Sequence, residues 1–196
     1  YRYDRPTSIT KDGIYMVGGK PFNPVLMYHL YGIQDIQTCA DNGINFMQGL
    51  VKKDPEEQLK YLDEMQKIGM KVAIVLYFDM KPAGHPQNID KTIAIVSAVK
   101  DHPAVFGYMI MDEPFANGQN VEPYLLESYK AIHDIDDKHP ILCCECYESC
   151  YEATSKYADI LVIDPYPGAW NDYGTHVGNR GEAARKILKY RKPVLN

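Results

Sequence analysis

The chain has 196 residues, of which 45% are hydrophobic and 24% are charged, which is typical of a globular protein with one sizeable core. Its formal net charge of -5, with no basic stripe along the sequence, argues against a nucleic-acid partner. No apolar run approaches the length of about 18 residues that a membrane span requires, so no span is predicted.

The opening segment, residues 12–22, is expected to form a small hairpin with Gly18-Gly19 at its turn. Short apolar runs then alternate with longer amphipathic runs to the end of the sequence. The apolar runs predict strands at Pro24–Leu30, Ile44–Leu50, Lys71–Phe78, Val105–Met111, Ile141–Cys146, Ile160–Ile163 and Pro193–Leu195. The amphipathic runs predict helices at Ile33–Asn42, Pro55–Ile68, Ile89–Lys100, Val121–Ile135, Ser149–Tyr157 and Gly181–Tyr190.

Apolar strands that alternate with helices indicate a parallel sheet with covered faces, in either a doubly wound or a barrel topology. A doubly wound dinucleotide fold would show a glycine-rich turn after its first strand, but that strand runs into His29-Leu30-Tyr31-Gly32. Polar and aromatic residues instead follow nearly every strand, where barrel enzymes place their active sites. These rim residues are His29, Gln48, Tyr77, Asp79, Asp112, Glu113, Glu145, Tyr147, Asp164 and Tyr166. The sequence therefore predicts an α/β fold of the TIM (β/α)₈ barrel type.

The predicted barrel is incomplete at its C-terminal end. The patterns give seven strands and six helices, whereas a complete barrel takes about 250 residues. We interpret residues 1–196 as a single barrel domain that opens with the hairpin segment 1–22 and whose eighth strand is not in the sequence. If the barrel truly ended at Asn196, we would expect a partner chain to close it, because an open sheet exposes apolar edges.

The five cysteines do not suggest a disulfide framework or a metal centre. They are Cys39, Cys143, Cys144, Cys146 and Cys150. Zinc sites usually combine two closely spaced ligand groups from different parts of the chain, and the sequence offers one group. We therefore expect these residues to be small buried apolar side chains.

The stretch that carries the most chemical information is an apolar strand ending in Asp112-Glu113-Pro114. Strand alternation places Glu113 on the same side as Met109 and Met111, so Glu113 would project into the barrel mouth and Asp112 would turn outward to support it. A partly desolvated carboxyl group stays protonated near neutral pH, as a general acid must. The alternative interpretation of this acidic pair is a helix cap or a salt bridge on the rim.

This arrangement resembles the clan A glycoside hydrolases, at the level of strand and helix order, over nearly all of the chain. The motifs behind the resemblance are Pro21-Phe22-Asn23-Pro24 before strand one, Asp112-Glu113-Pro114 after strand four and Asp164-Pro165-Tyr166-Pro167 after strand six. The resemblance implies that Glu113 is the acid/base of a retaining mechanism and that Tyr166 lies near a nucleophilic Glu beyond Asn196. Many clan members have Asn where this chain has Asp112. The resemblance also implies a carbohydrate substrate, no cofactor, and a secreted or cell-surface protein that degrades polysaccharides.

Further candidate substrate-binding residues follow the other strands. Asp164 and Tyr166 are two residues apart, so along an extended strand their side chains point to the same side and both could face the pocket. Trp170, the only tryptophan, lies in the loop after strand six and could stack on a sugar ring. The remaining rim candidates for substrate contact are His29, Tyr77, Asp79 and Glu145. Each of these residues has an alternative interpretation as local packing, a turn cap or a solvated side chain.

Two other functions fit the same sequence. Glu113, Glu145 and Asp164 follow three successive strands and could hold Mg²⁺ for enolate chemistry, although no late-strand base is visible. A barrel without a nucleophile could instead be a non-catalytic carbohydrate-binding or structural module at the cell surface. The aromatic rim and the 16 tyrosines suit binding as well as catalysis, and fold alone does not decide between them.

Overall fold

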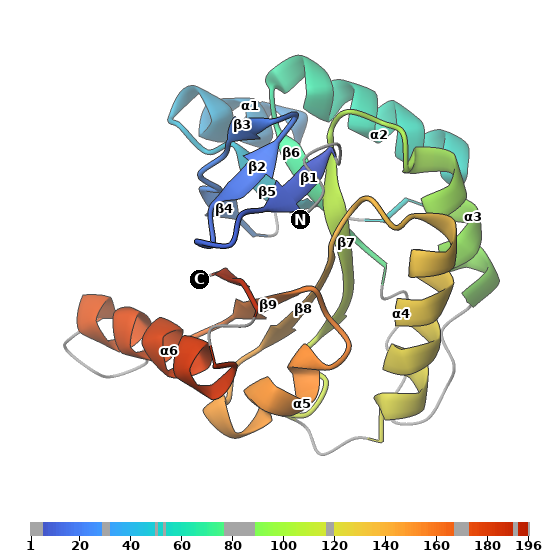
Figure 1. Ribbon diagram of the computed structural model, residues 1–196. Helices are drawn as coiled ribbons and strands as arrows, with labels where there is room; N and C mark the ends of the chain where they lie inside the picture. The colour runs from blue at the N-terminus through green and yellow to red at the C-terminus, as the bar shows by residue number, and fades with distance from the viewer. Residues whose placement is uncertain are drawn as a thin grey trace.

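The computed structural model describes residues 6–28, 32–49, 51–52, 54–76, 89–116, 120–166, 173–189 and 192–195. In this part of the chain, seven parallel strands form one curled sheet (Figure 1). The strands are β4 (Leu26–Met27), β5 (Phe46–Gly49), β6 (Lys71–Val75), β7 (Val105–Asp112), β8 (Ile141–Glu145), β9 (Ile160–Ile163) and β10 (Val194–Leu195). They are hydrogen-bonded in sequence order, with β4 and β10 at the two edges. The prediction of an α/β fold with an incomplete TIM barrel is confirmed.

Helices cover the outer face of this curled sheet (Figure 1). They are α1 (Ile33–Asp41), α2 (Pro55–Ile68), α3 (Ile89–Val99), α4 (Glu122–Ile135), the short pair η1 (Glu148–Cys150) and α5 (Tyr151–Ser155), and α6 (Tyr173–Ile187). Helix α6 begins at Tyr173 rather than at the predicted Gly181, because the glycines of its first half weaken the helical signal in the sequence. Within the described residues, no helix has the length and apolar character needed to cross a bilayer.

Helix α2 shows how local sequence sets these bounds. The Asp54 side chain accepts a hydrogen bond from the backbone N–H of Glu57 at 2.9 Å, and Pro55 occupies the first helical position. The helix ends at Gly69, whose φ of 86° is the left-handed conformation that glycine adopts without steric strain. Leu62 and Met65 are fully buried on the face that packs against the sheet.

The sheet separates an inner apolar core from apolar clusters on its outer face. The outer core lies between the strands and the helices, and it includes Leu62 of α2, Ile74 of β6 and Leu125 of α4. The inner core lies within the curl of the sheet, and it includes Phe46 of β5 and Phe106 of β7. Because the strands of a parallel sheet alternate their side chains between these two cores, each residue's core membership shows which way it faces.

An amino-terminal sheet closes the inner core at one end. Its antiparallel strands are β1 (Thr7–Ile9), β2 (Tyr15–Val17) and β3 (Lys20–Pro21), and the Gly18-Gly19 turn joins the last two. The Tyr15 ring lies 6.1 Å from the Phe106 ring, and the Phe22 ring lies 6.4 Å from the Phe46 ring. Phe46 and Phe106 lie near the amino ends of their strands, so this sheet covers the end of the barrel opposite to the candidate rim residues.

Candidate active site

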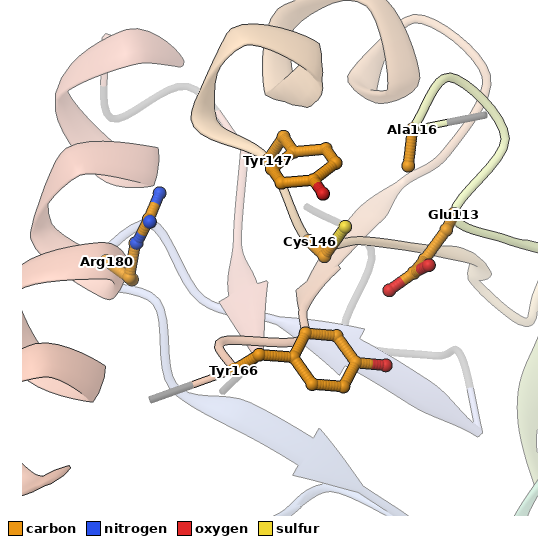
Figure 2. A pocket seen from close by; sticks show the side chains of 6 residues that line it. All are labelled: Glu113, Ala116, Cys146, Tyr147, Tyr166 and Arg180. Atoms are coloured by element: carbon orange, nitrogen blue, oxygen red, sulfur yellow. The ribbon is translucent and has the colours of Figure 1, made fainter. Parts of the chain in front are cut away.

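A pocket of about 230 Å³ opens at the carboxyl ends of β7, β8 and β9 (Figure 2). It is lined by Glu113 and Ala116 after β7, Cys146 and Tyr147 after β8, Tyr166 after β9, and Arg180 of α6. The carboxyl ends of parallel strands are the edge at which open and closed α/β sheets bind their ligands. The pocket therefore lies at the rim where the sequence pattern predicts an active site.

Glu113 contributes a carboxyl group to the lining of this pocket. It follows β7 with a φ of 45°, an uncommon conformation for a residue other than glycine, and its backbone N–H donates to the carbonyl oxygen of Cys144 at 3.0 Å. The carboxyl group points into the pocket (Figure 2), where its Oε1 atom is buried without a hydrogen-bond partner. Other buried polar atoms in the described residues also have no partner, so the position of Glu113 in the pocket is what distinguishes it.

Asp112 faces the inside of the barrel, so the expectation that it turns outward is wrong. The register of β7 against β8 shifts between Met109 and Met111, which interrupts the simple alternation of side chains. As a result Met111 belongs to the outer core, while Asp112 pairs with Cys144 of the inner core. Glu113 reaches the pocket through its backbone turn rather than through strand alternation.

Asp112 lies among other acidic and polar groups at the rim. The Tyr28 hydroxyl donates to its Oδ2 atom at 3.2 Å. Burial raises the pKa of Asp112, the carboxylates of Glu113 and Asp164 raise it further, and hydrogen bonds to Cys144 and Tyr28 oppose the rise. Burial and these neighbouring carboxylates therefore favour the protonated form of Asp112.

Replacement of Asp112 by Asn is expected to stabilise the fold at neutral pH. A carboxyl group whose pKa is raised by folding destabilises the folded state as the pH rises from the pKa of the unfolded state to the pKa of the folded state. An amide does not ionise, so it carries no such penalty. The melting temperature of Asp112→Asn, followed by circular dichroism, should therefore exceed that of the parent by an amount that grows from pH 4 to pH 8. The exposed replacement Asp134→Asn on α4 is the control. A difference between variant and parent that does not change with pH would contradict the expectation.

Asp164 and Tyr166 come together beside Glu113. Asp164 follows β9, and its backbone N–H donates to the carbonyl oxygen of Glu145 at 3.2 Å. A hydrogen bond to Asp164 raises the pKa of the Tyr166 hydroxyl, and burial and the charge of Glu113 act in the same direction. The Tyr166 side chain is 66% exposed, so most of it is accessible to a ligand.

Glu145 does not reach the pocket. Its side chain is fully buried, and it accepts hydrogen bonds from the backbone N–H of Phe115 at 3.2 Å, the backbone N–H of Cys146 at 2.9 Å and the Thr154 hydroxyl at 3.2 Å. Glu145 lies two residues after Cys143 on β8, so its side chain points to the same face of the sheet as Cys143, which belongs to the outer core. The structure thus places Glu145 as a structural acceptor under the helices rather than as a contact for substrate.

The carboxyl groups of Glu113, Glu145 and Asp164 do not converge on one point, because Glu145 is turned towards the helices. They therefore do not form the magnesium ligand set of the enolate-type alternative. In the part of the chain that the structure describes, no group of three or more His, Cys, Asp or Glu side chains is arranged to hold a metal ion.

The cysteines are all free thiols, and Cys143, Cys144 and Cys146 are buried, as expected. Cys39 and Cys150 are only half-buried. Burial, and then the neighbouring Glu113 carboxylate, raise the pKa of the Cys146 thiol to about 12. Cys146 therefore stays protonated near neutral pH and adds no negative charge to the pocket wall.

Four of the predicted substrate-binding residues, His29, Tyr77, Asp79 and Trp170, lie outside the described residues. Conversely, the pocket includes Cys146 and Arg180, which were not among the predicted rim residues, and Tyr147, which was predicted at the rim without a specific role. Cys146 ends a predicted strand, so the rule that barrel chemistry lies at strand ends could have found it as well. Arg180 lies within a helix, where nothing in the sequence pattern distinguishes it from a solvated arginine.

No protein-family model matches the chain. Among solved structures, it resembles a GH2 β-galacturonidase from Eisenbergiella tayi bound to glycerol, with a TM-score of 0.71 and 16% identity over 97% of this chain and 37% of that chain. It also resembles a β-D-glucuronidase from Dictyoglomus thermophilum, with a TM-score of 0.64 and 18% identity over 97% of this chain and 38% of that chain. A β-glucuronidase from an uncultured Clostridium species gives a TM-score of 0.62 and 20% identity over 97% and 38% of the two chains.

At these identities the likeness shows a shared fold. The chain spans less than two fifths of the length of each of these three structures, with 37 to 38% of each covered.

Proposed function

We propose that this chain carries the acid/base part of a retaining glycoside hydrolase, with Glu113 as the general acid/base. The observation that supports the proposal most directly is the placement of the Glu113 carboxyl group in a rim pocket, with Oε1 buried and without a hydrogen-bond partner. A group so placed can transfer a proton to a bound substrate without first breaking a bond at that oxygen. The solved glycosidases with the same fold add support by analogy.

In the first step, protonated Glu113 would give its proton to the glycosidic oxygen while a second carboxylate attacks the anomeric carbon. The bond from that carbon to the leaving oxygen breaks, and a covalent glycosyl ester forms. In the second step, the ionised Glu113 would take a proton from water, which attacks the ester and releases the sugar. The two carboxyl groups need a separation of about 5 to 5.5 Å for this mechanism, and we place the nucleophile on sequence that follows Asn196.

Two neighbouring groups suit the sugar in this pocket. Tyr147 and Tyr166 are 55% and 66% exposed, and both line the pocket with Glu113. Their rings offer apolar faces to the C–H groups of a sugar, and their hydroxyls offer polar contacts at its edge. The same two tyrosines would support a second candidate function, a non-catalytic carbohydrate-binding barrel, if no nucleophile meets Glu113.

The products of hydrolysis test the proposal. Protein isolated from its native source would be incubated with aryl β-glycosides of neutral and acidic sugars, and the first sugar released would be followed by proton NMR. Retention requires that the new hemiacetal has the anomeric configuration of the substrate. An inverted first product would contradict the retaining mechanism. Binding of sugars without any turnover would favour the carbohydrate-binding candidate instead.

A further inference from the structure

Two thiols that follow one another along β8 lie beside the two carboxyl groups at the end of β7. The sheet register pairs Asp112 with Cys144, and the backbone N–H of Glu113 donates to the carbonyl oxygen of Cys144 at 3.0 Å. Cys146 lies two residues after Cys144, so its side chain points to the same side of the extended chain, whereas Glu145 points towards the helices. The alternation of cysteines in this part of the sequence therefore matches the acidic pair on the neighbouring strand.

Each of these thiols makes a hydrogen bond to the carboxyl group that it faces. Cys144 bonds to Asp112 in this way. Cys146 bonds to Glu113, and both residues line the pocket. Figure 2 shows the Cys146 sulfur on the side of that residue nearer to the Glu113 carboxyl group. Oε1 of Glu113 has no hydrogen-bond partner, so the contact with Cys146 leaves this oxygen available to a substrate.

The direction of the bond between Cys146 and Glu113 follows from the protonation of the thiol. Burial, and then the hydrogen bond and the charge of Glu113, raise the pKa of the Cys146 thiol to about 12, so the sulfur keeps its proton near neutral pH. A protonated thiol can donate, and an ionised carboxylate can only accept. Hydrogen bonds to an ionised partner are stronger than those between neutral groups. The thiol therefore holds Glu113 more strongly when that carboxyl group is ionised.

We infer that Cys146 is a positioning residue for Glu113, whose thiol directs the carboxyl group into the pocket and stabilises the negative charge that it gains as its proton passes to the glycosidic oxygen. The inference rests on the proposed function, since it concerns the proton donor of the same pocket. An interaction that strengthens as charge develops lowers the barrier of the step, instead of binding substrate and transition state equally. Cys146 itself gives no proton to the substrate and forms no bond to it.

The dependence on leaving group separates this role from support of the fold. The protein from its native source and its variants Cys146→Ala and Cys146→Ser would be assayed with an alkyl glycoside and a 2,4-dinitrophenyl glycoside of the same sugar. Cys146→Ala should lower kcat/KM for the alkyl glycoside by roughly 2- to 10-fold, the effect of one ordinary hydrogen bond. The dinitrophenyl glycoside should lose much less, because its leaving group departs without a proton. Cys146→Ser should recover most of the loss, because a hydroxyl group is also a donor.

Three results of this assay would contradict the inference. They are an unchanged kcat/KM for Cys146→Ala on the alkyl glycoside, equal losses on both substrates, and a Cys146→Ser variant that is no better than Cys146→Ala. Equal losses on both substrates are the result expected if Cys146 only supports the fold.

The reactivity of the thiol tests the same contact without any turnover. Iodoacetamide reacts with the thiolate, so removal of the Glu113 charge should lower the pKa of Cys146 and speed its alkylation. At pH 9, Cys146 of Glu113→Gln should react about 3-fold faster for each unit by which its pKa falls, because the thiolate fraction grows tenfold while thiolate nucleophilicity declines. Tandem mass spectrometry locates the modified sulfur. Cys39 of α1 is the control within each sample, and Glu152→Gln, an exposed change on α5, is the control variant.

The alkylation result distinguishes a failure of this inference from a failure of the proposed function. Faster alkylation of Cys146 in Glu113→Gln, in a protein whose parent hydrolyses no glycoside, would support the contact and reject the proposed function only. Equal rates at Cys146 in Glu113→Gln and the parent would overturn the inference even if the parent is an active glycosidase. A rate that rises equally at Cys39, or equally in Glu152→Gln, would also count against it, because the change would then not be specific to the contact with Glu113.

Discussion

Replacement of Glu113 by Ala is expected to lower kcat/KM for glycosides with poor leaving groups by about 10²- to 10⁴-fold, the contribution usual for a general acid. A 2,4-dinitrophenyl glycoside should lose much less in its first step, because its leaving group departs without a proton. Release of the covalent intermediate would then limit turnover, since no base activates water. Azide, which needs no such base, should restore turnover and give a glycosyl azide of retained configuration.

The dependence on leaving group separates a catalytic role from a structural one. A variant that had only lost its fold would lose activity towards both substrates equally, and azide would not help it. Glu113→Gln serves as the matched variant of nearly unchanged size, and the melting temperatures of both variants should be compared with that of the parent. Equal turnover of Glu113→Gln and the parent on an unactivated glycoside would remove Glu113 from the mechanism.

Replacement of Glu145 by Ala is expected to destabilise the fold by several kcal/mol, because each buried donor left without an acceptor costs about 1 to 3 kcal/mol. The backbone N–H groups of Phe115 and Cys146 and the hydroxyl of Thr154 would all lose their acceptor inside the protein. Urea unfolding monitored by circular dichroism measures the loss as a shift of the midpoint.

The exposed change Glu152→Ala on α5 provides the comparison for Glu145, since it removes a carboxylate of the same type from the surface. Its free energy of unfolding should stay within about 0.5 kcal/mol of the parent. Equal midpoints for Glu145→Ala and Glu152→Ala would show that the three hydrogen bonds to Glu145 add nothing measurable to stability.

The strands and most helices of this fold could be predicted because local patterns determine them. Helix α2 begins at Asp54-Pro55 and ends at Gly69 for reasons that lie within those residues. The start of α6 could not be read in this way. Tyr173 and the glycine-containing turns that follow it are poor helix formers, and packing of α6 against its neighbours overrides that weak propensity.

Site residues could be predicted where their position along a strand alone determines that they lie at the rim. The strand end and Pro114 pointed to Glu113, and the structure places its carboxyl group in the rim pocket. The direction of Asp112 was not predictable, because a register shift between two neighbouring strands leaves no signal in one strand's sequence. Glu145 is different, since simple alternation from Ile141 through Cys143 already predicts that it faces the helices.

The amino-terminal sheet has a consequence for how the chain folds as it is synthesised. Its Phe22 ring packs 5.9 Å from the ring of Phe106, a residue of β7 that leaves the ribosome much later. Until β7 has been made, the apolar side of this early sheet has no complete surface to cover it. Contacts between distant parts of a chain slow folding, and nascent domains with uncovered apolar surface are the ones that aggregate or engage chaperones. The amino-terminal sheet is thus fully covered only when the fourth strand of the barrel has been made.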